Sequence, residues 1–262
     1  MNNSSNPRTP SIASAFTLME ILVVVAIILV LAAIAFPVYS AIQQKAHKAM
    51  ATQNMRQLTS ALNTWASQND DTLPDEDAKG SDTWQTAAMP ESDKAWYNCL
   101  PRLLGMKGVG DYAKTPRDFY TKENLLFLPG AEYPETDKKL VKPLFAIAIN
   151  TKLQRKASKD EKKAPLKKSM ITNPSRTVIF LEQGLPNEKK ATAVQSKNDY
   201  DGSPKGSAKS MAGRYSGAGV LTFMDGHAET VQVKDTLTET GRFPFPQIDI
   251  VWTAKPEDDP NK

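Results

Sequence analysis

The sequence predicts an α+β protein in which a long N-terminal helix, transmembrane in its first half, packs on a small antiparallel sheet with long loops. Three observations predict this fold class. Residues 21–36 form an unbroken apolar run, helical periodicity continues beyond it, and four short apolar runs later in the chain have strand character. A small sheet must bury one face, and the amphipathic second half of the helix is its expected partner.

The apolar run is long enough to cross a bilayer. Residues 21–36 contain no polar side chain, and extension back to Phe16 gives a helix of roughly 31 Å, close to one hydrocarbon thickness. A secretory signal peptide is the competing interpretation, but its apolar region is shorter and ends at a small-residue cleavage site. Because this run continues into a further helical pattern, we expect residues 16–36 to be retained as a transmembrane segment.

The helical pattern extends well past the apolar run. An apolar stripe follows at spacings of three and four residues, formed by Ala51, Met55, Leu58, Leu62 and Trp65. Polar residues 68–71 and then Pro74 end the pattern, so the predicted helix spans residues 16–69 and extends roughly 81 Å. We expect residues 70–262 to form the globular domain.

Four apolar runs predict strands at residues 143–150, 177–182, 219–224 and 228–233. Asp225-Gly226 between the last two predicts a hairpin with a type I′ turn. That register places His227 opposite Met224. It puts one set of side chains on a single face, namely Val220, Thr222, Met224, His227, Glu229, Val231 and Val233, and leaves Leu221 and Phe223 on the other. Residues 187–214 are rich in Lys, Ser, Gly and Asn, which predicts a flexible insertion.

Composition excludes several classes of site. A single cysteine, Cys99, forms neither an intrachain disulfide nor a cysteine zinc site, and two histidines do not make a histidine-rich metal centre. The net charge of +4 arises largely from a basic stretch at residues 152–168. This stretch has no interleaved aromatic residues and matches no nucleic-acid-binding module, so we expect no nucleic-acid partner.

Two groups of acidic residues are candidates for a metal site or a catalytic site. Five carboxylates between residues 70 and 77 offer oxygen ligands for calcium, but their spacing matches no standard calcium loop. Asp225, His227 and Glu229 suggest a catalytic or metal cluster, yet turn chemistry accounts for Asp225. We therefore expect no catalytic residue, metal or cofactor, and a membrane-tethered hydrolase has only Asp225 and His227 in its favour.

Glu20 does not fit an inert membrane anchor. An acidic residue inside a membrane segment costs up to roughly 2.5–3.5 kcal/mol near the centre and less near an end. One interpretation is a carboxylate close enough to the lipid headgroups to stay hydrated. The other is a partner that neutralises its charge.

Residues 15–37, which read AFTLMEILVVVAIILVLAAIAFP, resemble the signal of type IV pilins and type II secretion pseudopilins. The resemblance implies that a prepilin peptidase removes leader residues 1–15 by cutting between Ala15 and Phe16, and methylates the new amine of Phe16. Ala15 stands where the family usually has glycine. The resemblance also implies that Glu20 meets the Phe16 amine of a neighbouring subunit. Pro37 is then a helix kink used when subunits leave the bilayer, and the alternative is a kink that is merely tolerated at the membrane boundary.

A second run, residues 214–227, reads RYSGAGVLTFMDGH and is similar to the C-terminal motif of prepilin-type proteins abundant in planctomycetes. Asp225, Gly226 and His227 form the Asp-Gly-His part of this motif, and residues 171–182 resemble the strand that precedes it. Tyr215 stands where those proteins have a histidine. A role that needs an imidazole is therefore not expected at Tyr215, whereas an aromatic packing role is.

The resemblance implies a pilin-like subunit that assembles into a type II secretion pseudopilus or a type IV pilus, for protein export or adhesion. Its implied partners are the prepilin peptidase, other pilin or pseudopilin subunits, an inner-membrane assembly platform and the lipid bilayer. The N-terminus is then cytoplasmic and the globular domain periplasmic, although Arg8, Lys45 and Lys48 give this orientation little support by charge.

An alternative is a membrane-tethered module that binds the cell envelope or its glycans without polymerising. An exposed aromatic platform among Trp84, Trp96 and Trp252 would favour this alternative.

Overall fold

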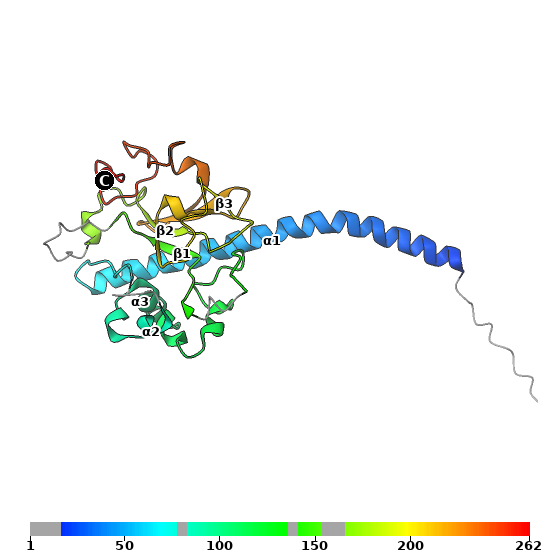
Figure 1. Cartoon of the computed structure of the whole chain (residues 1–262), viewed down its shortest axis with the longest axis horizontal. Helices are drawn as coiled ribbons and strands as arrows, with labels where there is room; N and C mark the ends of the chain where they lie inside the picture. The colour runs from blue at the N-terminus through cyan, green and yellow to red at the C-terminus, as the bar shows by residue number, and fades with distance from the viewer. Residues whose placement is uncertain (1–16, 78–82, 136–140, 154–165) are drawn as a thin grey trace, which may run out of the picture. The chain divides into compact units, whose positions relative to one another are not determined.

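The computed structural model describes residues 17–77, 83–135, 141–153 and 166–262, and at residues 35–38 it describes the backbone alone. The chain divides into two compact units, Met1–Gln43 and Gln44–Lys262, which we call the N-terminal and C-terminal units. Helix α1 (Leu18–Gln68) begins in the first and ends in the second (Figure 1). The predicted α+β class and the long N-terminal helix are confirmed, with helix ends within two residues of those expected.

In the N-terminal unit, α1 presents its apolar side chains outward on every side. Among residues 18–34, whose side chains are described, Val23 is the least exposed of the large apolar residues at 45%, and Leu18 is 82% exposed. Among the described residues this helix is long and apolar enough to cross a membrane. None of the residues in its most apolar stretch is buried. Length and composition therefore agree with the predicted transmembrane segment.

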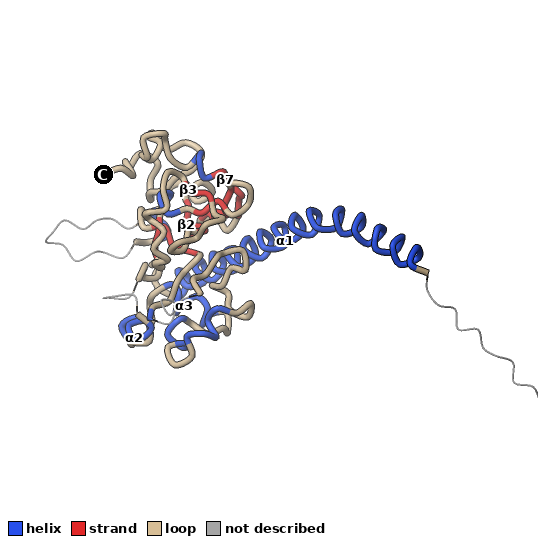
Figure 2. The backbone as a smooth tube through the Cα atoms, turned by 45° about the vertical axis from the view of Figure 1, so that its right-hand side comes forward, coloured by secondary structure: helices blue, strands red, loops and turns tan. Residues whose placement is uncertain are grey.

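In the C-terminal unit, the predicted apolar stripe of α1 forms part of the core. Ala51, Met55, Leu58 and Leu62 are fully buried, and Trp65 packs against the same cluster. The Thr59 hydroxyl lies 3.0 Å from that of Thr222 and joins the helix to the sheet. In Figures 1 and 2 the short helices and strands β2 and β3 lie on different sides of this part of α1.

A five-stranded sheet runs in the order β4-β1-β2-β6-β7. Its strands are β1 (Ile147–Asn150), β2 (Val178–Glu182), β4 (Lys205–Gly206), β6 (Ala218–Phe223) and β7 (Ala228–Gln232). The four predicted strands are present, but β1 has only the second half of its predicted range, β6 is shifted by one residue, and β2 and β7 are each one residue shorter. The sheet is mixed and not purely antiparallel, because β4 pairs with β1 in parallel. A separate two-stranded sheet joins β3 (Thr192–Ala193) to β5 (Ala212–Gly213).

Strands β1, β2 and β6 are buried on both faces, which explains their continuous apolar sequences. One face contributes Val220 and Phe180 to the core that contains α1. The other contributes Leu221 and Phe223 to a second cluster that includes Trp252 from the C-terminal loops. The long C-terminal segment thus covers a sheet face that would otherwise be exposed.

The hairpin between β6 and β7 differs from the prediction by one residue. Gly226 N–H donates to the Phe223 carbonyl at 2.9 Å, and Phe223 N–H donates to the His227 carbonyl at 3.0 Å. Gly226 has φ 101°, whereas Asp225 is not among the residues with positive φ. Both central residues of a type I′ turn need positive φ, so the loop is a type I turn closed by a glycine bulge.

The shift changes which side chains share a face. Leu221 pairs with Glu229, and His227 lies opposite Phe223 and not opposite Met224. His227, Glu229 and Val231 therefore lie on the face of Leu221 and Phe223, so the predicted face was wrong. A slip of one residue moves every side chain of a strand to the other face.

The predicted flexible insertion at residues 187–214 was also wrong. It contains β3, β4 and β5, and it buries Tyr200, Met211 and Arg214. The prediction followed the polar composition of the whole segment, which does not reveal that a few of its side chains are buried. Two short helices, α2 (Trp84–Ala87) and α3 (Trp96–Leu103), lie earlier in the unit. Among the described residues there are also 3-10 turns, at Pro90–Ser92, Val109–Tyr112, Pro116–Tyr120, Lys168–Met170, Ala208–Ser210 and Val233–Asp235.

Candidate functional site

Helix α1 begins with a reciprocal pair of hydrogen bonds. Thr17 N–H donates to Glu20 Oε2 at 2.8 Å, and Glu20 N–H donates to Thr17 Oγ1 at 3.2 Å. This is a capping box, which satisfies backbone donors that have no partner at a helix N-terminus. The Thr-x-x-Glu spacing signals the box in the sequence, but our sequence interpretation considered only headgroup hydration or a neighbouring subunit for Glu20. The structure adds a role within the chain itself.

The other predicted features of this region are only partly within the described residues. Ala15 and Phe16, the predicted processing site, lie outside them, as does the leader. Pro37 lies within α1, which is helical on both sides of it, but its side chain is not described. The kink at Pro37 stays a prediction.

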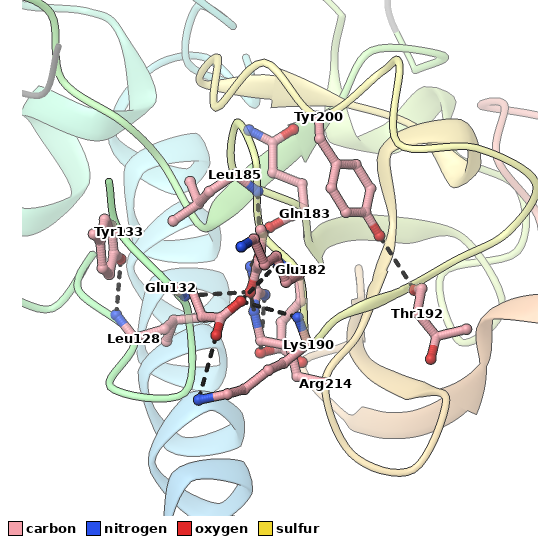
Figure 3. A network of polar contacts seen from close by, with 12 residues as sticks. Leu128, Glu132, Tyr133, Glu182, Gln183, Leu185, Lys190, Thr192, Tyr200 and Arg214 are labelled. Atoms are coloured by element: carbon pink, nitrogen blue, oxygen red, sulfur yellow. Dashed lines mark hydrogen bonds and ion pairs between the residues drawn. The ribbon is translucent and has the colours of Figure 1, made fainter. Parts of the chain in front are cut away.

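A buried charge network centres on Arg214 (Figure 3). Arg214 Nε and Nη2 donate to the two carboxylate oxygens of Glu188, each at 2.8 Å, and Nη2 also donates to the Gln183 carbonyl at 2.6 Å. Nη1 lies 3.6 Å from Glu182 Oε1. The Arg214, Glu182 and Glu188 side chains are all at most 3% exposed. One guanidinium thus serves two carboxylates, with its bidentate face toward Glu188.

Glu182 interacts more weakly with that guanidinium than Glu188 does, since it lies 3.6 Å from Nη1 whereas Glu188 accepts two hydrogen bonds of 2.8 Å. Tyr215 Oη donates to it at 3.0 Å and Val220 N–H donates to it at 2.8 Å. Burial raises the pKa of Glu182, and Arg214 together with these two hydrogen bonds opposes that rise only in part. Tyr215 therefore has a definite role within this network. Its hydroxyl satisfies a buried carboxyl group, and its ring packs in the core.

A surface layer of hydrogen bonds covers this network. Glu132 accepts from the backbone N–H groups of Lys189 and Lys190 at 2.7 and 2.9 Å, and these bonds, led by that from Lys190, lower its pKa. Glu132 N–H in turn donates to Glu188 at 3.3 Å. Figure 3 shows that the participating residues come from separate loops and from β2. The network joins these segments to one another. Buried ion pairs can in this way help to specify one fold over alternative arrangements of the loops.

The sequence contained signals for this network that our interpretation did not use. Glu182 ends an otherwise apolar strand, and Arg214 directly precedes the aromatic residue of the second motif. An acidic residue within a buried run requires a partner. Nothing in the spacing identifies that partner, because Glu188 and Arg214 are brought together only by the fold.

The Asp-Gly-His motif lies at the tip of the β6–β7 hairpin. Asp225 Oδ1 accepts from His227 N–H at 3.0 Å and lies 2.6 Å from His227 Nδ1, while Nε2 lies 3.4 Å from Glu229. The imidazole stacks on Phe223 at 4.3 Å. These side chains are at least one third exposed. Among the described residues, no group of three or more His, Cys, Asp or Glu is arranged to hold a metal ion.

The acidic residues 70–77 point to separate partners. Asp71 Oδ2 accepts from Ser169 N–H at 2.7 Å, and hydrogen bonds from the side chain and then the backbone of Ser169 lower the pKa of Asp71. Asp77 forms an ion pair with Lys205. These two contacts connect the loop after α1 to later segments of the C-terminal unit.

The three tryptophans do not form an exposed platform. Trp84, Trp96 and Trp252 are each at most 1% exposed. Trp96 Nε1 donates to the Pro204 carbonyl at 3.0 Å, and its ring packs against Phe180. The feature that would have favoured the tethered binding module is therefore not found at these three residues, which pack in the core.

Two adjoining pockets follow α1 within the C-terminal unit. The first, of about 360 Å³, lies between the helix, the hairpin tip and Lys168, and is lined by Arg56, Ser60, Asn63, Thr64, Ser67, Lys168, Asp225 and Gly226. The second, of about 580 Å³, is lined by Ala49, Thr52, Gln53, Arg56, Gln57 and Ser60. Since Arg56 and Ser60 line both, we call the two together the α1 groove.

Three features thus stand out in the described chain: an exposed apolar helix with a capped start, a buried charge network and the polar α1 groove. The first is long and apolar enough to cross a membrane, the second joins segments far apart in the sequence, and the third is lined mainly by polar side chains. Comparison of the chain with protein-family models, with curated proteins and with solved structures finds no match.

Proposed function

We propose that the chain is a pilin-like subunit, cleaved after Ala15, methylated at Phe16 and assembled through its N-terminal helix into a type II secretion pseudopilus or type IV pilus. One observation carries the proposal. The apolar, outward-facing stretch of α1 begins directly after a prepilin-like processing motif.

An exposed apolar helix needs a non-aqueous environment. A bilayer provides one before assembly, and the apolar helices of neighbouring subunits provide another in a fibre. Such a helix meets both environments without refolding, since its backbone hydrogen bonds are internal. The folded C-terminal unit, with its own core on residues 51–66, is the part that a fibre would display.

The capping box is compatible with a second role for Glu20 in assembly. Within the described residues its hydrogen bonds with Thr17 use Oε2. A carboxylate has further lone pairs on its other oxygen, Oε1. In the proposed fibre, that oxygen accepts from the Phe16 amine of a neighbouring subunit, so each subunit's helix start is capped internally and paired externally.

The proposal includes a location and a set of partners. The helix spans the inner membrane of a bacterium with its N-terminus in the cytoplasm, and the C-terminal unit is periplasmic. The prepilin peptidase, other subunits and the inner-membrane assembly platform are the protein partners. The single apolar helix among the described residues supports a membrane location of this single-pass kind.

Mass spectrometry of the N-terminus of the membrane-extracted protein tests the proposal. We expect a chain that begins with methylated Phe16 and lacks residues 1–15. A matched variant, Ala15→Glu, places a bulky charge before the cut and should accumulate with Met1 intact. An uncleaved wild-type chain in the membrane would instead favour the anchored binding module that does not polymerise.

A further inference from the structure

The α1 groove has an unusual composition for a solvent-facing helix surface. Arg56 is the only charged residue between positions 49 and 69, whereas the exposed face of an amphipathic helix ordinarily carries charged side chains. Hydroxyl and carboxamide groups take their place in both pockets. Neutral hydrogen-bonding groups of this kind suit a ligand with many hydroxyls.

The hydroxyl groups in the groove are oriented as acceptors. Thr52 donates its proton to the Lys48 carbonyl at 2.9 Å, Thr64 to Ser60 at 3.1 Å and Ser67 to Asn63 at 3.0 Å. A hydroxyl has one proton and two lone pairs, so each of these three oxygens keeps the capacity to accept a hydrogen bond. The groove thus offers a row of acceptors to ligand donors.

The positive charges are at the first pocket. Arg56 and Lys168 line it together with the carboxylate of Asp225. In the described part of the chain, the side chains of Arg56 and Lys168 make no ion pair, because the pairs present involve other residues. Within this lining two cations face one carboxylate, and Lys168 also acts electrostatically on the carboxylate of Asp71 outside it. Arg56 is therefore the cation that best complements a singly charged acid group.

We propose that the α1 groove binds an acidic oligosaccharide, with its acid group on Arg56 and Lys168 and its hydroxyls on the acceptors of α1. Ala49 and Ser67 lie roughly 27 Å apart along the helix axis. The two pockets adjoin at Arg56 and Ser60, which line both, and this arrangement along the helix suits an extended chain of sugars. The inference goes beyond the proposed subunit function, since it assigns a recognition surface to the C-terminal unit.

Binding of defined oligosaccharides to the full chain in detergent tests this proposal by calorimetry. The probe is oligogalacturonate, and a sulfated malto-oligosaccharide distinguishes a carboxylate from a sulfate as the preferred acid group. Two comparison ligands each lack either the acid group or the hydroxyl groups. A neutral malto-oligosaccharide of equal length has no acid, and oligoglutamate of equal charge has no hydroxyls.

We expect one of the acidic sugars to bind at least tenfold more tightly than either comparison ligand. Arg56→Gln and Lys168→Gln should each weaken it at least fivefold. Arg117→Gln and Lys114→Gln, which remove exposed charges elsewhere in the unit, should leave it unchanged. Thr64→Val should weaken it without changing net charge.

Three results would overturn the proposal: no binding of either acidic sugar, equal binding of oligoglutamate, or equal loss in the control variants. None of these outcomes depends on cleavage or assembly. A failure here therefore leaves the proposed subunit function standing, and an uncleaved N-terminus would leave the groove proposal standing.

Discussion

Residues 18–34 and residues 51–66 belong to one helix, yet their apolar side chains have opposite environments. Leu29 is 65% exposed and Leu58 is fully buried. The backbone hydrogen bonds are of the same kind in both stretches, so helix formation does not depend on which environment is present. Helix α1 is therefore one secondary-structure element whose two stretches contribute differently. Residues 51–66 stabilise the core of the C-terminal unit, whereas the apolar side chains of residues 18–34 have no such cover within the described chain.

The carboxylates of the two units show the same contrast. Glu20 is exposed and bonded to a residue three positions away. Glu182 is fully buried and is satisfied by residues more than thirty positions away. Loss of a partner should therefore be a local event at Glu20 and a global one at Glu182.

The largest expected effect follows from removal of Arg214. Arg214→Met leaves Glu182 and Glu188 buried without a cation, which should lower the free energy of unfolding by about 3–5 kcal/mol. Urea denaturation of the protein in detergent measures it, with Arg117→Met as an exposed control. Glu182→Gln should cost less, because it mimics the protonated form that burial favours. A loss below about 1 kcal/mol in Arg214→Met would show that the network is not structural.

A matched pair of leucines tests the two stretches of α1 directly. Leu58→Ala creates a cavity in the core and should cost about 2–5 kcal/mol in the same denaturation experiment. Leu29→Ala shortens a side chain that is 65% exposed, so it should leave the unfolding midpoint of the C-terminal unit unchanged. Equal costs for the two variants would contradict the division of roles.

The smallest effect on folding is expected at the start of the helix, where two variants separate capping from charge. Glu20→Gln keeps the capping box, since glutamine serves in it as well as glutamate, but removes the charge. Thr17→Ala keeps the charge and removes the cap, which should speed amide exchange in the first turn roughly fivefold.

Fibre incorporation after membrane insertion distinguishes the two contributions. Glu20→Gln should insert normally and incorporate poorly, and Thr17→Ala should resemble the wild type in both respects. If Thr17→Ala were the more defective of the two, the cap and not the charge would be what assembly requires. Shearing and sedimentation of fibres against total membrane protein provide the measurement.

Much of the fold could be predicted because its signals are local. The ends of α1 and the four main strands follow from long or strongly apolar patterns. The hairpin was misjudged because Asp225-Gly226 suits two turns that both need positive φ at glycine and differ in loop length by one residue. That single residue decided the position of His227.

The candidate sites depend more on tertiary structure. The capping box is readable from four residues, but the Arg214 network joins residues 182, 188 and 214 from segments with no common periodicity. The α1 groove likewise needs Lys168 and Asp225 to approach the helix. Patterns in the chain show that Glu182 requires a partner; they do not show which loop supplies it.

The position of the capping box has a consequence for maturation. Thr17 and Glu20 both lie after the proposed cut between Ala15 and Phe16, so removal of the leader takes away no atom of the box. The helix start is therefore the same in precursor and product. Proteolysis would change the charge at the end of the chain while the rod behind it keeps its shape, and a subunit held in the membrane would be ready for export without a folding step.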